Sequence, residues 1–227
     1  MRHHLIIIFM ALAFATLASC EQDNYDKGEG IYSNLTADFV EAHANSDKNI
    51  DYVITDAGDS LNVTNSFTTA WTNTPDSTYR MALYYNKVGG DKIEAVTSTV
   101  MNNLSLTPPD SIKEMKTDPI GFESSWTSKN GRYLNLAITL RVGTIVESSK
   151  KHKITLVTDS IVEQGDKRTL HLTFFHDKGD IPEYYTQKYY FTLSSNRLSS
   201  YGTDSAAIHI NTTGSGMKTL RFGLGGQ

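Results

Sequence analysis

Residues 133–142 read Tyr-Leu-Asn-Leu-Ala-Ile-Thr-Leu-Arg-Val, and every second residue of this stretch is a large aliphatic one. Successive side chains of a β-strand point to opposite faces, so a period of two predicts a strand with one buried face. This is the most regular pattern in the chain. The same rule recurs downstream in residues 169–174, 188–193, 208–211 and 219–224.

Turn-forming residues separate these strands, at residues 129–131, 164–166, 177–180 and 214–216. Strands that are apolar on one face bury that face by stacking two antiparallel sheets. The sequence therefore predicts an antiparallel β-sandwich over residues 116–227.

Residues 32–107 favour short strands, and no window shows a sustained helical period. Ile50, Tyr52 and Ile54 are expected on one face of a hairpin whose turn is residues 56–59. About five strands without a crossover helix suit a small Greek-key barrel such as the OB-fold. The fold class is thus all-β, an OB-like barrel followed by a sandwich.

Pro108 and Pro109 mark the boundary between the two modules. Proline cannot donate a hydrogen bond to a sheet, and paired prolines hold the backbone extended. The sequence therefore predicts a linker at residues 108–115.

The N-terminus carries an apolar run from Leu5 to Phe14, preceded by Arg2 and followed by Leu17-Ala18-Ser19-Cys20. The run is shorter than the roughly 20 residues that a membrane-spanning helix needs. We expect a lipoprotein signal peptide at residues 1–19, a lipid anchor such as palmitate on Cys20, and a flexible acidic tether at residues 20–31. A secretory peptide with a coincidental cysteine, or an uncleaved N-terminus, remains an alternative.

The expected location is the outer membrane, with the membrane contacted through the lipid. Acidic residues directly after the cysteine resemble the surface-export signal of Bacteroidetes lipoproteins, and both the cell surface and a periplasm-facing position stay open. Cys20 is the only cysteine, so no disulfide is expected. A net charge of −4 makes nucleic acid a poor partner.

Four features resemble the NigD-like family of Bacteroidetes lipoproteins. They are the leader with its acidic tether, the hairpin over residues 52–63, the strand over residues 79–85, and Trp126 followed by Arg-Tyr-Leu-Asn-Leu at residues 132–136. The resemblance implies an N-terminal OB-like domain, a C-terminal β-sandwich, and a role near bacteriocin production or immunity. It brings no catalytic residues.

Histidines and acids offer little sign of a reaction centre. His171 and His209 fall on the solvent side of their strands, and His176, Asp177 and Asp180 fit turn chemistry as well as metal ligation. No spacing matches a closed zinc or calcium loop. We predict no metal and no cofactor.

Catalytic motifs are not found in the sequence. Neither Gly-x-Ser-x-Gly nor a phosphate-binding glycine loop occurs. Glu94, Asp118 and Glu123 are ordinary solvated acids in this pattern. We predict no catalytic residues and no enzyme.

Aromatic residues are the better indication of binding. Trp71 lies in a long polar stretch, and Tyr190 takes the outward position of its strand. Either ring could contact a sugar or a partner surface. The alternative is that Trp71 caps the barrel and the tyrosines pack at an edge or domain interface. Trp126 is expected in the core.

Asp-Ser pairs suggest modification, because they resemble the Bacteroidetes O-glycosylation signal. The acceptors would be Ser60, Ser77, Ser111, Ser160 and Ser205.

The leading hypothesis is a lipid-anchored, non-enzymatic binding or accessory module, bacteriocin-associated by family resemblance, with an unknown protein or glycan partner. The alternatives are a secreted carbohydrate-active or metal-dependent hydrolase, and a structural component of a cell-surface assembly.

Overall fold

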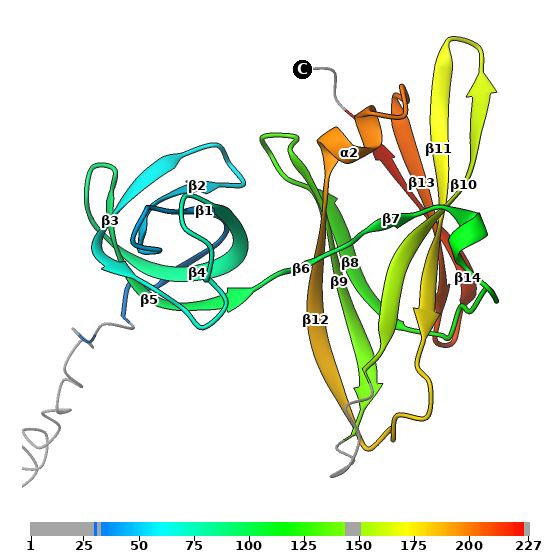
Figure 1. The fold of residues 1–227 in the computed structure, drawn as a ribbon, viewed down its shortest axis with the longest axis horizontal. Helices are drawn as coiled ribbons and strands as arrows, with labels where there is room; N and C mark the ends of the chain where they lie inside the picture. Colours follow the sequence, from blue (N-terminus) through cyan, green and yellow to red (C-terminus); the bar gives the residue numbers. More distant parts are fainter. Residues whose placement is uncertain (1–29, 31–32, 144–150, 225–227) are drawn as a thin grey trace, which may run out of the picture. The chain divides into compact units, whose positions relative to one another are not determined.

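The computed structural model describes residue 30, residues 33–143 and residues 151–224 (Figure 1). Strands make up most of this part of the chain, so the prediction of an all-β protein is confirmed. The elements are β1 (Thr36–Ala44), β2 (Ile50–Thr55), β3 (Ser60–Phe67), β4 (Thr78–Gly89), β5 (Lys92–Val100), β6 (Asn102–Asn103), β7 (Leu106–Thr107), η1 (Pro109–Ser111), β8 (Gly121–Thr127), β9 (Tyr133–Val142), β10 (Lys153–Gln164), β11 (Lys167–Asp177), β12 (Tyr185–Ser194), α2 (Ser195–Ser199), β13 (Ser205–Thr212) and β14 (Gly216–Gly223).

The first five strands close into a barrel in the order β1-β2-β3-β5-β4, with β4 paired back to β1. β3 and β5 run parallel, and the other neighbours run antiparallel. This is the strand order of an OB-like Greek-key barrel, as predicted. The barrel core consists of Val40, Ala42, Ala44, Ile50, Val53, Leu61, Val63, Met81, Leu83, Tyr85 and Ile93.

Strand β2 does not follow the predicted alternation. Ile50 is buried, but Tyr52 is 38% exposed and Val53 is buried in its place. The pairing of β2 with β1 shifts register here, because Ala44 pairs with Ile50 and its neighbour His43 pairs with Tyr52. A bulge inserts an extra residue and turns the following side chains to the other face. The prediction that Ile50, Tyr52 and Ile54 share one face is therefore wrong.

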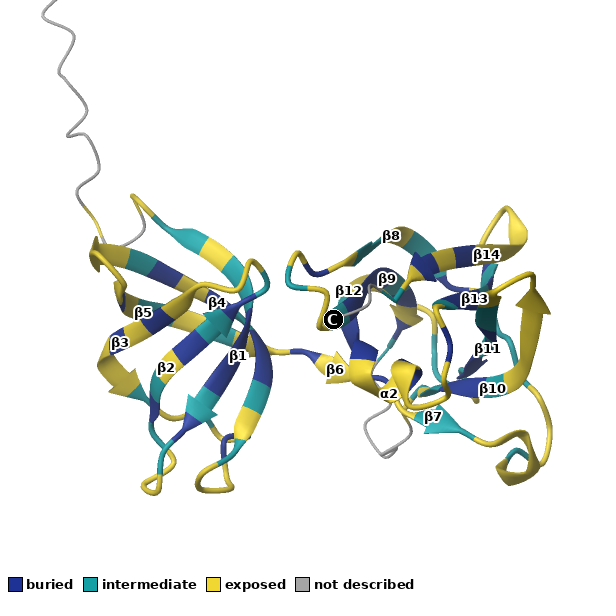
Figure 2. Cartoon of the chain, turned by 90° about the horizontal axis from the view of Figure 1, so that it is seen from above, coloured by how far each residue is buried: buried dark blue, intermediate teal, exposed yellow. Residues whose placement is uncertain are grey.

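The second half forms two sheets that enclose one core (Figure 2). One sheet has the order β14-β13-β11-β10-β7, and the other has the order β6-β12-β9-β8. Most neighbours are antiparallel, as predicted, but β11–β13, β10–β7 and β12–β6 are parallel pairs. Leu134, Leu136 and Ile138 belong to the sandwich core, as the alternation in β9 predicts. Asn135 and Ala137 on the opposite face are buried as well, so the prediction of a half-buried strand is wrong for this part of β9.

Residues 102–107 join the two sheets of the sandwich. The sequence assigns them to the barrel, but β6 pairs with β12 and β7 pairs with β10. Leu104, between them, is 3% exposed and belongs to the sandwich core. In the structure the sandwich thus begins near Asn102, ahead of the linker predicted at residues 108–115.

Barrel and sandwich belong to one compact unit that starts at Thr36. Within the described ranges, no helix is long and apolar enough to cross a membrane. The predicted signal peptide and Cys20 lie outside those ranges, so the lipid anchor stays a prediction.

Candidate binding site between barrel and sandwich

A buried ion pair lies where the barrel meets β9 and β12. Nη2 of Arg80, on β4, is 2.6 Å from Oδ1 and 2.8 Å from Oδ2 of Asp56, in the turn after β2. Asn135 of β9 donates from Nδ2 to Oδ2 of Asp56 over 3.0 Å and accepts from Oγ1 of Thr192 over 3.0 Å. These bonds connect a barrel turn to two sandwich strands.

Burial and pairing act in opposite directions on Asp56. Burial raises the pKa of the Asp56 carboxyl, and the Arg80 guanidinium partly offsets this by lowering the pKa. A carboxylate in such a place is stable as an anion only with a partner. The charge of Asp56 is therefore already balanced by Arg80.

Glu41 of β1 makes a second connection to the sandwich. The Tyr133 hydroxyl donates to Oε1 of Glu41, and Nη1 of Arg132 lies 2.7 Å from Oε2. Burial, followed by the hydrogen bond to Glu41, raises the pKa of Tyr133 well above its usual range, so this hydroxyl keeps its proton. The Arg80 guanidinium stands 4.0 Å from the centroid of the Tyr133 ring, a cation–π contact.

The turn between β8 and β9 closes the same junction. Asn130 donates its backbone N–H to the Asp56 carbonyl over 2.9 Å and its Nδ2 to the Thr55 carbonyl over 3.2 Å. Ser128 Oγ donates to Oδ1 of Asn130 over 2.7 Å. Two turns that the sequence predicts separately therefore dock onto each other.

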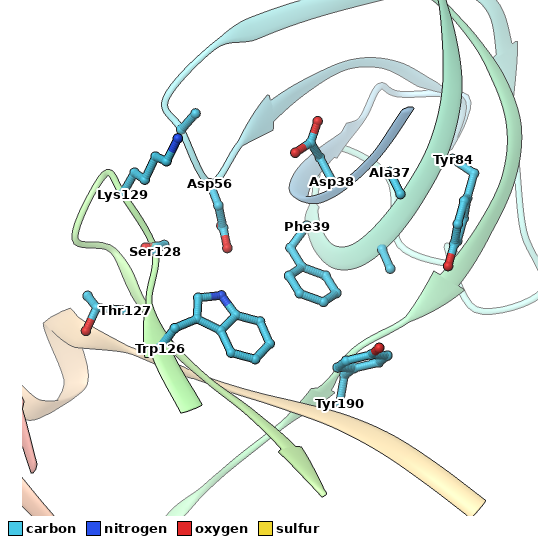
Figure 3. A pocket seen from close by; sticks show the side chains of 12 residues that line it. Ala37, Asp38, Phe39, Asp56, Tyr84, Trp126, Thr127, Ser128, Lys129 and Tyr190 are labelled. Atoms are coloured by element: carbon cyan, nitrogen blue, oxygen red, sulfur yellow. The ribbon is translucent and has the colours of Figure 1, made fainter. Parts of the chain in front are cut away.

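Beside this network lies a cavity of about 370 Å³, which we call the junction cavity (Figure 3). Four aromatic residues line it, namely Phe39, Tyr84, Trp126 and Tyr190. The Phe39 and Trp126 rings stack at 5.5 Å between centroids, and Phe39 and Tyr190 lie 5.2 Å apart. Figure 3 shows Trp126, Phe39 and Tyr190 gathered together, with Asp56 pointing toward Trp126.

The register of the barrel strands explains why there is space here. In the β1–β4 ladder, Ala37 lies beside Tyr84, and Phe39 lies beside Ala82. Small and large side chains thus alternate diagonally across the barrel's outer face. Both alanines line the cavity, so the hollow lies between the rings of Phe39 and Tyr84.

Trp126 does not lie in the sandwich core, where the sequence places it. It is half-buried and pairs across the β8–β9 ladder with Asn135, so both side chains lie on the outer face of the sheet. The alternation in residues 133–142 already predicts that Asn135 lies on the face of β9 that points away from the sandwich core. The pairing of Trp126 with Asn135 is long-range information that the sequence pattern does not contain.

The structure separates the two aromatic residues proposed as ligand-binding. Tyr190 pairs with Ala137 on the outer face, as its parity predicts, and lines the junction cavity. Trp71 packs against the barrel core and meets Tyr79 edge-on at 6.0 Å. The position of Trp71 therefore corresponds to the capping alternative.

The five serines of the glycosylation motifs differ in access. Ser60, Ser111 and Ser160 are exposed, whereas Ser77 and Ser205 are half-buried. Ser205 Oγ also lies 2.7 Å from Oγ1 of Thr169. Modification of any of them stays a prediction.

The histidines form two pairs on the sandwich. His171 Nδ1 lies 2.9 Å from His209 Nε2. The buried His176 donates from Nδ1 to the Asp118 carbonyl over 2.9 Å, and its Nε2 lies 2.9 Å from Nδ1 of His152. Among the described residues, no three His, Cys, Asp or Glu side chains gather in a way that could hold a metal ion.

Residues 102–224 match the family of the NigD-like C-terminal beta sandwich domain, which is more than half of the chain. No curated protein sequence matches the chain significantly.

Several solved structures share the fold. A NigD-like immunity protein from Bacteroides caccae is 19% identical with a TM-score of 0.63, over 83% of this chain and 92% of that one. A candidate toxin-related protein from Parabacteroides distasonis is 17% identical with a TM-score of 0.61, over 83% and 92%. A candidate lipoprotein from Bacteroides fragilis is 16% identical with a TM-score of 0.61, over 85% and 98%. At these identities the likeness concerns the fold.

Proposed function

Because the chain belongs to the NigD-like family, we propose that it is a lipid-anchored accessory protein of the cell envelope that recognises a partner without catalysing a reaction. The observation that carries the recognition role is the junction cavity, where two β modules bring four aromatic side chains together. Ligand sites are typically concave, mostly apolar and placed between domains.

The two carboxylates near the cavity are already paired, which supports a role in recognition and not in acid–base catalysis. Asp56 is paired with Arg80, and Glu41 is held by Tyr133 and Arg132. A general acid or base needs a carboxyl group that can exchange a proton with a substrate. Both groups instead connect the barrel to the sandwich.

The anchor part of the proposal rests on the expected signal peptide at residues 1–19, directly before Cys20, and on the likeness to a candidate lipoprotein. Metabolic labelling with a palmitate analogue tests it. The wild-type protein should be labelled and sediment with outer membranes, and Cys20→Ser should abolish both. An unlabelled wild-type protein would contradict the anchor, and protease treatment of intact cells would separate surface from periplasmic exposure.

An immunity role is supported by the likeness to a NigD-like immunity protein. Deletion of the gene should then make the host cell sensitive to a bacteriocin that neighbouring cells of the same strain release. Partner capture from envelope extract distinguishes this from a structural role in a surface assembly. Capture through the junction cavity should be lost in Trp126→Ala and kept in Tyr201→Ala, which removes an aromatic ring that does not line the cavity.

A further inference from the structure

We propose that the junction cavity binds a neutral pyranose ring of a glycan. This inference rests on the proposed function, because it takes the cavity to be the recognition site, and it adds the chemical class of the ligand. The argument uses the ring faces, the free hydrogen-bond donors and the charges that border the cavity.

The rings provide a surface for a flat apolar face. Trp126, Phe39 and Tyr190 form one contiguous aromatic group, and Tyr84 faces it across the hollow left by the alanines (Figure 3). A pyranose presents C–H groups on one face and hydroxyls around its edge. It can therefore pack on aromatic rings while its polar groups remain outside the contact.

Unused donors border the same space. No hydrogen bond among the described residues involves the indole N–H of Trp126 or the hydroxyl of Tyr84, and no ion pair there involves Lys129. A purely apolar ligand would bury such donors without replacing their hydrogen bonds to water, and this loss costs free energy. A ligand with a polar edge satisfies them.

The charges that border the cavity give no net preference for an ionic ligand of either sign. A cation would find the Asp56 carboxylate occupied by Arg80, and the Tyr190 ring already has Nζ of Lys188 5.2 Å from its centroid. Asp38 and Lys129 also line the cavity, and they carry one charge of each sign. A neutral, hydroxyl-rich ring needs no net charge from its site.

The size of the cavity limits the ligand to a small group. At about 370 Å³ it is near the lower end of ligand pockets, which typically range from about 300 to 1,000 Å³. One sugar ring fits such a volume. Tyr84 is 37% exposed, so the remainder of a glycan chain can leave along its side of the cavity.

The two tryptophans allow a direct test. Trp71→Phe leaves Trp126 as the sole indole reporter. Titration of this variant with a panel of neutral hexoses, N-acetylhexosamines and their oligomers should produce a saturable change in fluorescence. Calorimetry on the wild-type protein gives the affinity, which Trp126→Ala and Tyr84→Ala should each weaken by up to about tenfold.

Tyr201→Ala is the matched control, because Tyr201 is also 37% exposed but is not one of the residues that line the cavity. It should bind as the wild-type protein does, and thermal melts confirm that all variants fold. The inference is overturned if no neutral saccharide binds, if Trp126→Ala binds equally well, or if only charged sugars or free nucleosides bind. If saccharides fail while Trp126→Ala still abolishes capture of a protein partner, the recognition role stands and only the ligand class is wrong.

Discussion

The Arg80 guanidinium and the Asp56 carboxylate form an ion pair of 2.6 Å within the barrel, where Asn135 of the sandwich also bonds to Asp56, with 3% and 16% of the two side chains exposed. Removing one partner of a buried pair leaves the other charged group without compensation. Arg80→Met should therefore lower the free energy of unfolding by about 3–5 kcal/mol, measured by urea denaturation.

The double variant Arg80→Met with Asp56→Asn tests the cause. It should be less destabilised than the sum of the single variants, because no buried carboxylate remains and the amide can still bond to Asn135. Glu163→Gln breaks the exposed pair with Arg168 and should cost no more than about 1 kcal/mol. Equal losses in the buried and exposed pairs would contradict the assignment.

Tyr133→Phe removes the hydroxyl that donates to the buried Glu41 while Arg132 stays in place. We expect a loss of about 1–3 kcal/mol in the free energy of unfolding, because an acceptor that is 4% exposed loses one partner. Tyr189→Phe is the control, since its hydroxyl bonds only to the exposed Gln187. A loss in Tyr133→Phe no greater than in Tyr189→Phe would show that the Glu41 contact contributes little.

Gly121 of β8 pairs with Thr139 of β9, and no space is left for a Cβ at this glycine. A Cβ at this position would lie 2.0 Å from Oγ1 of Thr139, whereas at Gly223, also in a strand, it would meet nothing within 4 Å. Gly121→Ala should destabilise the fold by about 1–3 kcal/mol, and Gly223→Ala should be near neutral. Adding Thr139→Ala to Gly121→Ala should recover much of the loss in urea midpoint; an unchanged midpoint would show that Thr139 is not the obstacle.

Local pattern predicted much of the fold. The alternation in residues 133–142 predicted which face of β9 joins the sandwich core, and residues 56–59 form the predicted turn, with Gly58 at a φ of +99°. Both features depend on neighbours in the chain. The bulge after Ile50 and the crossing of residues 102–107 between the sheets depend on partner strands, which the sequence pattern does not specify.

The candidate site was predicted only in part for the same reason. Tyr190 follows from the parity of its own strand. The position of Trp126 requires the register of β8 on β9, and the Arg80–Asp56 pair requires β2 and β4 to flank β1 in the barrel. The outward position of Trp126 follows from its pairing with Asn135, and it can be predicted only when that strand pairing is known.

The stacked pair of His152 and His176 should make stability sensitive to acid. Burial lowers the pKa of both imidazoles, and for His152 the neighbouring His176 adds to the effect, while Asp118 partly opposes it at both. The unfolded chain, with histidine pKa values near 6.5, then binds protons more readily than the folded chain. The contribution of the pair is fully present above about pH 6.5 and is lost as the pH falls through the lowered pKa values.

Urea midpoints from pH 7.5 to 5 should decline less in His152→Gln and in His176→Gln than in the wild-type protein. Some decline remains in both, because burial also lowers the pKa of His43 and His171. Variants that keep the full wild-type decline would assign the acid sensitivity to other groups.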